Sequence, residues 1–158
     1  MILKMKKVRG FEIAKGFENK GINLPIRKTK GSAGYDFEVA EDVVVPKFEK
    51  GQKPTIIKTG VKAYMPEDEV LYLYGRSSNF KKKGLMLANN VGVVDSDYYG
   101  NEETDGHIMF SVINFKDEDV LIKKGDVVGQ GVFSKYLLVD DDNAQGKRTG
   151  GFGSTDKK

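Results

Sequence analysis

The chain has 158 residues, of which 31% are charged and 39% hydrophobic, and it contains no cysteine and a single histidine, His107. This composition predicts one soluble globular domain, excludes disulfides, and excludes a zinc site built on several histidines. The net charge of +3 is too small to indicate nucleic-acid binding, and no apolar run approaches the roughly 20 residues that cross a bilayer. We therefore expect a cytoplasmic protein without membrane or direct nucleic-acid contacts. Any catalysis would depend on carboxylates, main-chain amides, arginine or lysine side chains and a recruited cation.

Short apolar and β-branched runs, separated by turn-forming residues, recur along the chain. The runs expected to form strands are residues 43–45, 55–57, 70–74, 108–113, 127–128 and 132–139. Many short strands at this spacing predict an all-β sandwich or barrel. No window has a helical apolar period with capping residues, although one helical turn at residues 85–89 is compatible with the sequence.

Three polar segments are expected to lie outside the core. Residues 101–106 predict a protruding loop, residues 140–146 interrupt the last strand, and residues 147–155 lack any core-forming pattern. Little in the last segment offsets the entropy of ordering it, so we expect a mobile arm there. The chain is therefore divided into a β domain of residues 1–142 and a flexible C-terminal arm of residues 143–158.

The first stretch with chemical character is the run of small residues that leads into Tyr35 and Asp36. Small residues allow the chain to turn closely. An acid beside a phosphate-binding loop can orient the water shell of Mg²⁺. The alternative is an ordinary Asx-type turn that leads into a strand.

Three glycine-rich stretches have the composition of phosphate-binding loops: residues 75–78, residues 129–131 and the arm around Phe152. Glycine lets main-chain amides converge on one anion, and hydroxyls and a cation add further contacts. No segment fits a P-loop or a strand–turn–helix dinucleotide fingerprint. Phe152, flanked by glycines, could close over a planar ring such as a nucleobase, or could simply dock on the protein surface.

Residues 92–100 have a glycine at each end and enclose Asp95, a second acid and two tyrosines. The valines favour an extended backbone and the glycines favour tight turns, so we expect a β-hairpin turn with a carboxylate and an aromatic ring at its mouth. The carboxylate can activate a water molecule, and the ring can pack on a flat or sugar-like ligand. An ordinary hairpin with solvated acids is the alternative for this stretch taken alone.

Five segments, taken in order, resemble the five sequence motifs of the trimeric dUTP pyrophosphatases, or dUTPases. These segments are residues 24–36, 75–85, 88–98, 125–130 and 148–155, which together cover most of the chain. The resemblance implies a jelly-roll-like β fold, a homotrimer with active sites shared between subunits, and Mg²⁺-dependent hydrolysis of dUTP to dUMP and pyrophosphate. It implies that the first, second and fourth motifs of a site come from one chain, the third from a second chain and the fifth from a third.

The resemblance also implies roles for individual residues. Asp95 matches the general base, Tyr98 the ring under the deoxyribose, and Asp36 the acid that holds Mg²⁺ through water. The uracil-reading and other substrate-binding positions of the hairpin and the next strand are Asn89, Gly92, Val93, Val94 and Met109. The phosphate ligands are Arg76, Ser77, Ser78 and Gln130. The arm supplies Phe152 as a lid over uracil and Arg148, Gly153, Ser154 and Thr155 as γ-phosphate ligands.

The sequence departs from the family pattern at three places. Asn101 stands where a glutamate often follows the hairpin glycine, and residues 101–106 look like an insertion. Val127 replaces an arginine that is common in the fourth motif. Many relatives have the arm arginine at the position of Lys147, so either Lys147 or Arg148 is expected to grip the γ-phosphate.

Two other functions are compatible with the same fold. A nucleotide-sensing binding protein would contact a regulatory protein partner, and the inserted loop and the basic N-terminus offer surfaces for it. A dCTP deaminase would need an acid three residues before Asn114, where this chain has Ser111. The missing carboxylate disfavours the deaminase.

Overall fold

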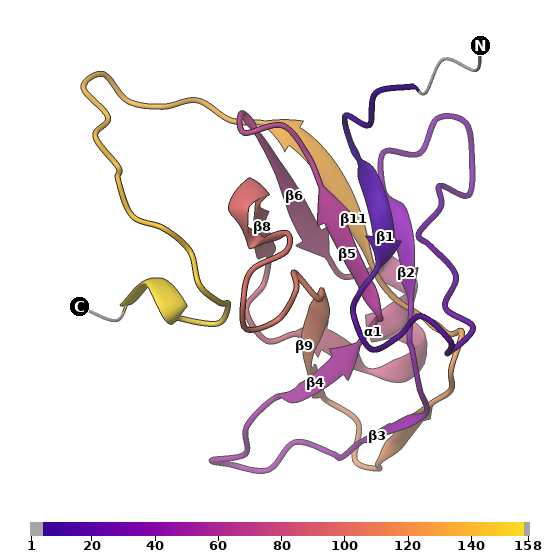
Figure 1. The fold of residues 1–158 in the computed structure, drawn as a ribbon. Coiled ribbons are helices and arrows are strands. Elements are labelled where there is room, and N and C mark those ends of the chain that lie inside the picture. The colour runs from indigo at the N-terminus through magenta and orange to yellow at the C-terminus, as the bar shows by residue number, and fades with distance from the viewer. Residues whose placement is uncertain (1–4, 157–158) are drawn as a thin grey trace.

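The computed structural model describes residues 5–156, and Figure 1 shows how their strands and single short helix are arranged. The strands are β1 (Gly10–Ile13), β2 (Tyr35–Glu38), β3 (Val43–Val45), β4 (Thr55–Lys58), β5 (Val61–Tyr64), β6 (Glu69–Tyr74), β7 (Leu85–Leu87), β8 (Gly92–Asp95), β9 (Met109–Asn114), β10 (Val120–Ile122) and β11 (Val127–Lys135). Helix α1 spans Ser77–Lys83, and two 3₁₀ turns span Ser96–Tyr98 and Ser154–Asp156. The predicted all-β class is confirmed. No helix in this part of the chain has the length and apolar character needed to span a membrane.

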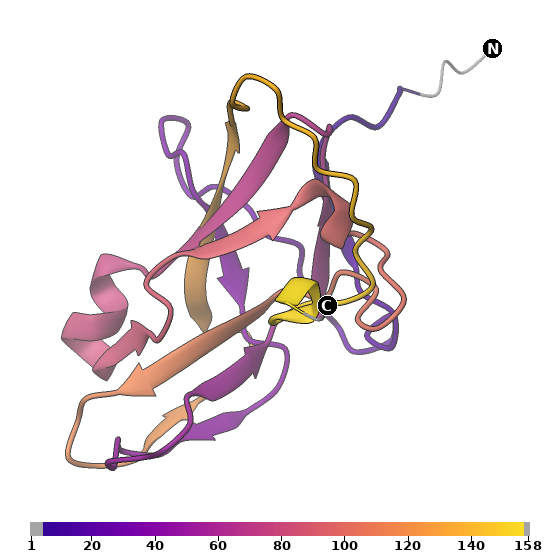
Figure 2. The ribbon, with the colours of Figure 1, turned by 90° about the vertical axis from the view of Figure 1, so that its left-hand side faces the viewer.

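The strands form two larger antiparallel sheets and two ribbons. The four-stranded sheet has the order β2-β11-β6-β8, and the three-stranded sheet has the order β4-β9-β7. Strand β1 pairs with β5, and β10 pairs with β3. The views of Figures 1 and 2 show the four-stranded sheet above the three-stranded one, with α1 at their border.

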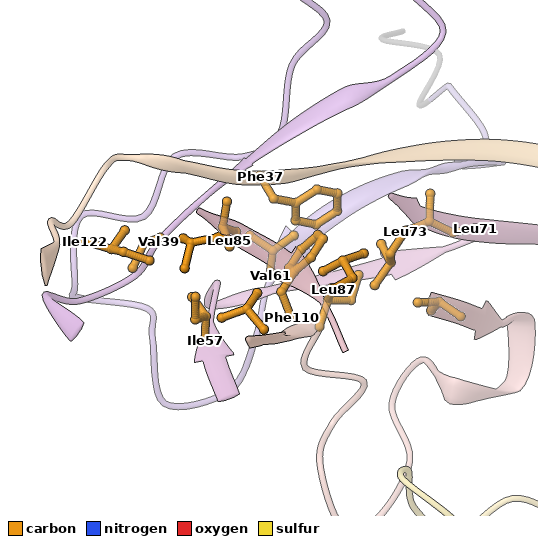
Figure 3. Close-up of a cluster of buried hydrophobic side chains, with 14 of the residues drawn as sticks. Phe37, Val39, Ile57, Val61, Leu71, Leu73, Leu85, Leu87, Phe110 and Ile122 are labelled. Atoms are coloured by element: carbon orange, nitrogen blue, oxygen red, sulfur yellow. The ribbon is translucent and has the colours of Figure 1, made fainter. Parts of the chain in front are cut away.

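The core fills the space between the two larger sheets (Figure 3). Buried and partly exposed residues alternate strictly along β9, where Phe110 and Val112 are buried and Ser111 between them is partly exposed. The Phe110 ring meets the Phe37 ring of β2 at a centroid distance of 5.5 Å, in an edge arrangement that aromatic pairs favour. Each such buried side chain contributes about 1.5–3 kcal/mol relative to an exposed one. This ring contact joins β9 of one sheet to β2 of the other.

Strand β11 stands where the sequence predicted two separate strands. Residues 127–128 and 132–139 were expected to form separate strands, but one strand runs from Val127 to Lys135. The strand continues through Gly129 and Gly131. Glycine is needed at position 131 because a methyl group there would lie 2.9 Å from the Phe37 ring. The strand ends early because its partner β6 ends: Lys135 pairs with Glu69, the first residue of β6. Residues 137–139 are therefore exposed and outside any strand.

Helix α1 was not predicted, and the helical turn that the sequence allowed at residues 85–89 does not form, because that segment begins with β7. With seven residues, the helix is too short to show an apolar period. Its signals are local instead. Gly84 ends it in the left-handed conformation at φ 67°, after three lysines in the last turn. The buried Asn79 amide fixes it to β11 by donating to the Val128 carbonyl at 2.6 Å.

Residues 101–106 were expected to form a protruding loop, but they fold back onto the body of the protein. Asn101 is only 8% exposed, and its Nδ2 donates to the Tyr98 carbonyl at 2.7 Å. Asp105 accepts from the Lys62 ammonium at 2.8 Å and from the Lys15 main chain at 2.9 Å. The loop is therefore tied to β5 and to the end of β1, although its sequence is almost entirely polar.

Candidate active site

A pocket of about 210 Å³ lies beside β8, at the start of β9 and against the end of the arm. Its lining residues, among those that the structure describes, are Leu73, Asn89, Gly92, Val93, Val94, Asp95, Tyr98, Ile108, Met109, Arg148, Gly151 and Phe152. The volume is below the roughly 300–1,000 Å³ typical of ligand pockets. This pocket can therefore hold only part of a nucleoside triphosphate.

The acidic side of the pocket is formed by Asp95, the last residue of β8. Strand β8 pairs with β6, and β7 pairs with β9, so residues 92–100 do not form the two-stranded hairpin that the sequence predicted. The chain instead leaves β8 through the 3₁₀ turn Ser96–Tyr98. The Asp95 side chain is 49% exposed, and its carboxylate therefore remains accessible to water and ligands.

Tyr98 forms a fixed wall of the pocket. Its ring is buried, and its hydroxyl donates to the His107 carbonyl at 2.6 Å. Burial raises the pKa of Tyr98, so the phenol stays neutral and continues to donate this bond. Burial and the bond at its hydroxyl hold the ring in place.

The arm reaches the pocket through Arg148, which lies on two carboxylates of the same chain. Its Nη2 donates to Asp95 Oδ2 at 2.6 Å, and its Nε donates to Asp97 Oδ1 at 2.7 Å. The views of Figures 1 and 2 show the arm leaving β11, passing beside the body and returning to the side where β8 lies. Lys147, the other candidate for the phosphate grip, is exposed. Of these two residues, only Arg148 lines the pocket.

His107 has a structural role. Its Nε2 accepts a hydrogen bond from the Gly60 main chain at 2.9 Å, and its ring packs on Phe17 at 4.7 Å. Burial, together with the nearby charge of Lys58, lowers the pKa of His107 to about 4. A neutral histidine that accepts a main-chain bond is not free to act as a proton relay.

A second group of predicted site residues gathers at one end of the four-stranded sheet. Gln130 of β11 pairs with Asp36 of β2 on one side and with Tyr74 of β6 on the other. Asp36 is 6% exposed, and the Arg76 Nε lies 3.5 Å from its carboxylate. The Gln130 amide donates to the Gly75 carbonyl at 3.3 Å. Strand pairing thus brings the first, second and fourth motifs together, and Ser77 and Ser78 follow as the first residues of α1.

The predicted site residues therefore fall into separate sets. The pocket gathers Asn89, Gly92, Val93, Val94, Asp95, Tyr98, Met109, Arg148 and Phe152. The residues that do not line it are Asp36, Arg76, Ser77, Ser78, Gln130, Lys147, Gly153, Ser154 and Thr155. The sequence did not single out Leu73 and Ile108 of the pocket lining, or Asp97, which bonds to Arg148. The signal for Asp97 was its place two residues after Asp95, and Leu73 and Ile108 look like ordinary strand residues.

Together these features define a jelly-roll-like β protein with an acidic pocket that is lined in part by a C-terminal arm. The dUTPase family model matches residues 20–156. A deoxyuridine 5'-triphosphate nucleotidohydrolase of Lactococcus lactis is 54% identical over 151 residues, which cover 94% of this chain and 98% of that protein. The enzyme of the same name from Desulfitobacterium hafniense (strain DSM 10664 / DCB-2) is 37% identical over 146 residues, covering 87% of this chain and 90% of that protein.

A solved structure is similar as well. The crystal structure of the dUTPase from Streptococcus mutans matches with a TM-score of 0.75 and 45% identity, over 83% of this chain and 98% of that one. The chain belongs to the dUTPase family. The family inferred from the five motifs and the expected jelly-roll-like β fold are thereby confirmed, and the predicted enzyme class is the one that these relatives carry.

Proposed function

We propose that the protein hydrolyses dUTP to dUMP and pyrophosphate. The observation that carries this proposal is the pocket in which Asp95, the buried Tyr98 ring and Arg148 of the arm meet, in a chain of the dUTPase family. A water molecule attacks the α-phosphorus, Asp95 takes the proton of that water, and the bond from the α-phosphorus to the pyrophosphate oxygen breaks. Holding the water and phosphorus in line accounts for much of the acceleration.

Selectivity for a deoxyribonucleotide follows from the walls of the pocket. The Tyr98 ring packs under the deoxyribose and leaves no room for a 2′-hydroxyl. The ring keeps this position because the Tyr98 phenol is bonded to the His107 main chain. The main chain of Gly92 to Val94 offers donors and acceptors for the edge of uracil, with Asn89 beside them. Phe152 of the arm covers the opposite face of the base.

The triphosphate is held by the second group of residues. Arg76 supplies a guanidinium fork, and Ser77, Ser78 and Gln130 supply neutral donors. Because this group does not line the pocket of its own chain, we propose that complete sites form between the copies of a homotrimer. In that assembly the arm of another copy would take the place that the chain's own arm occupies here.

A magnesium ion fits this arrangement only with the help of the substrate. Among residues 5–156 no group of three or more acids, histidines or cysteines is placed to hold a metal. Asp36, a buried carboxylate beside Arg76, fits an ion that takes most of its ligands from phosphate oxygens and water. When bound, such an ion would offset charge on the departing pyrophosphate.

The alternative deaminase reaction finds no support in the local geometry. Ser111 of β9 offers a hydroxyl and no carboxylate. Asn114 is buried and donates to the Val45 carbonyl at 3.0 Å, so it serves the core.

Incubation with each dNTP and with UTP, in the presence of Mg²⁺, tests the proposal. Released pyrophosphate and released ammonia are both measured. We expect pyrophosphate from dUTP and little from dTTP, dCTP or UTP. Failure to release pyrophosphate from dUTP would contradict the proposed function, and ammonia from dCTP would favour the deaminase.

A further inference from the structure

We propose that Tyr99 is a positioning residue for the pocket, because its bond to Glu12 of β1 fixes the turn that carries the Tyr98 ring. Neither Tyr99 nor Glu12 is among the described residues that line the pocket, and the reaction proposed above uses neither. Their effect on selectivity rests on the proposed function, in which the Tyr98 ring is the wall beneath the deoxyribose. Their effect on the turn itself does not rest on it.

Tyr99 follows Tyr98 directly but serves a different part of the molecule. The Tyr98 ring is buried and lines the pocket, whereas Tyr99 is 39% exposed and reaches the ribbon of β1 and β5. The main chain at Tyr99 has φ −59° and ψ 127°, which ends the 3₁₀ turn. An anchor on Tyr99 therefore acts on the main chain immediately next to the pocket wall.

The ribbon holds Tyr99 by three contacts. The Tyr99 hydroxyl donates to Glu12 Oε1. The Lys62 ammonium lies 5.1 Å from the centroid of the Tyr99 ring, and this ring meets the Tyr64 ring at 6.1 Å with an interplanar angle of 71°. Glu12 and Lys62 are direct cross-strand partners, so the two charged groups that contact Tyr99 stand side by side on the ribbon.

The charges around Glu12 keep it ready to accept this bond. Lys7 Nζ donates to the other carboxylate oxygen, Glu12 Oε2, at 2.9 Å. The bonds from Lys7 and Tyr99 lower the pKa of Glu12, and the bond to Glu12 raises the pKa of Tyr99 to about 12. At neutral pH a protonated phenol thus donates to a charged carboxylate, which is stronger than a bond between neutral groups.

The same ribbon also fixes the chain beyond Tyr99. The Lys62 ammonium donates to the Asp105 carboxylate at 2.8 Å, and the Asp105 carbonyl accepts from the Gly100 N–H at 3.0 Å. Gly100 has a φ of +67°, in the left-handed region that glycine adopts readily. All these contacts lie within the β domain of one chain. They therefore do not depend on which copy supplies the arm.

The anchor matters because a steric wall discriminates only if it cannot recede. The Tyr98 phenol is fixed to the His107 main chain, and Tyr99 attaches the same stretch of backbone to β1. Without the second attachment the turn can move away from the sugar, so that a 2′-hydroxyl is tolerated. Displacements of about 1 Å at an active site are enough to change rates strongly. The Tyr99 bond should therefore affect the choice between dUTP and UTP more than it affects folding.

The selectivity of Tyr99→Phe tests this role, because the variant removes only the hydroxyl. We expect the ratio of kcat/KM for dUTP to kcat/KM for UTP to fall about tenfold, the effect of losing one hydrogen bond to a charged group. This ratio does not depend on the fraction of folded protein, so a merely structural role would leave it unchanged.

A second variant asks whether Glu12 acts through the same bond. Glu12→Gln keeps an acceptor oxygen without the charge, so a smaller fall in the ratio is expected. The double variant Glu12→Gln/Tyr99→Phe should lose no more selectivity than Tyr99→Phe alone, since both changes weaken one bond. Tyr64→Phe is the matched control, because it removes a neighbouring hydroxyl of the same cluster while Tyr99 keeps its bond to Glu12. Its ratio should equal that of the unmodified protein.

Hydrogen exchange of the nucleotide-free, full-length protein tests the anchor without any substrate. The Gly100 and Asn101 amides are bonded within the segment that Tyr99 is proposed to hold. We expect them to exchange about tenfold faster in Tyr99→Phe and at the unmodified rate in Tyr64→Phe.

The two measurements separate this proposal from the proposed function. An unchanged ratio in Tyr99→Phe, an equal fall in Tyr64→Phe, or a fall without faster exchange would overturn the positioning role. If the exchange responds as expected but the unmodified protein does not hydrolyse dUTP, the proposed function fails and the anchor of the turn stands. If dUTP is hydrolysed selectively and neither ratio nor exchange responds to Tyr99→Phe, the proposed function stands and the anchor fails.

Discussion

Arg148 Nη2 lies 2.6 Å from Asp95 Oδ2, so the arm's guanidinium is paired with the residue proposed as the general base. The same guanidinium bonds to Asp97 at 2.7 Å, and its side chain is only 17% exposed. In the proposed reaction the substrate's γ-phosphate is a stronger partner, because guanidinium and phosphate form charge-assisted, often bidentate bonds. Binding of the triphosphate would therefore draw Arg148 away and leave Asp95 free to accept a proton.

Replacement of Arg148 tests this exchange of partners. Arg148→Lys keeps the charge but loses the planar fork, so it cannot bind phosphate in bidentate geometry. We expect kcat/KM for dUTP to fall by about tenfold or more, the loss of one good charge-assisted pair. Lys147→Ala, which removes an exposed charge from the neighbouring position, should cost less. A larger loss in Lys147→Ala would assign the phosphate grip to Lys147.

The arm as a whole is expected to serve catalysis and not folding. Removal of residues 147–158 deletes Arg148 and Phe152 but leaves β11 and the core intact. We expect a cooperatively unfolding protein of near-normal stability whose pyrophosphate release from dUTP is strongly reduced. Urea unfolding and the release assay check the two halves of this prediction. Full turnover in the truncated protein would remove the proposed role of the arm.

His107 makes stability depend on pH. Its pKa is about 4 in the folded protein and about 6.5 when unfolded, so the unfolded state binds the proton more readily between these values. The free energy of unfolding should therefore fall as the pH drops from about 6.5 towards about 4, by up to about 3 kcal/mol from this group.

A glutamine in place of His107 isolates this contribution. The glutamine oxygen can accept the Gly60 hydrogen bond, and the side chain has no proton to gain. Urea unfolding at pH 7.5 and 4.5 should show a smaller loss of stability in His107→Gln than in the unmodified protein. Equal losses would mean that His107 is not buried in its neutral form.

Gly129 is expected to matter for packing, although it was first interpreted as part of a phosphate loop. A methyl group there would overlap the Phe110 ring and lie 2.8 Å from the Tyr74 carbonyl. We expect Gly129→Ala to lower the free energy of unfolding by about 1–3 kcal/mol. Gly146→Ala, with open space around it, should change stability by less than about 0.5 kcal/mol. Urea denaturation compares the two, and equal stabilities would argue against the core explanation.

The sequence predicted the fold class correctly, because the class depends on local patterns. Alternation along β9 and the acid at the end of β8 are visible in the residues themselves. The missed features depend on partners far away in the chain. The end of β11 is set by the start of β6, and the compact loop at residues 101–106 is set by the buried Asn101 and by Lys62. Helix α1 was missed because seven residues are too few to show a helical apolar period, and its main signal is the single capping glycine, Gly84.

Only some of the contacts among the proposed site residues follow from local sequence. Asp95 and Tyr98 share one short segment, so their proximity follows from the sequence. The pairing of Gln130 with Asp36, in contrast, requires the order β2-β11-β6, which no local pattern specifies. The contact of Glu103 with Thr149 joins an insertion to the arm, and neither segment has a core-forming pattern that would indicate it.

Asp95→Asn tests most directly whether Asp95 accepts the proton of the attacking water. The amide keeps the size of the side chain and can still bond to Arg148 through its oxygen, so folding and dUTP binding should be nearly unchanged. We expect kcat for pyrophosphate release from dUTP to fall by about 10²–10⁴-fold, the contribution of a general base. Release at the rate of the unmodified protein, with dUTP bound equally well, would contradict the assignment.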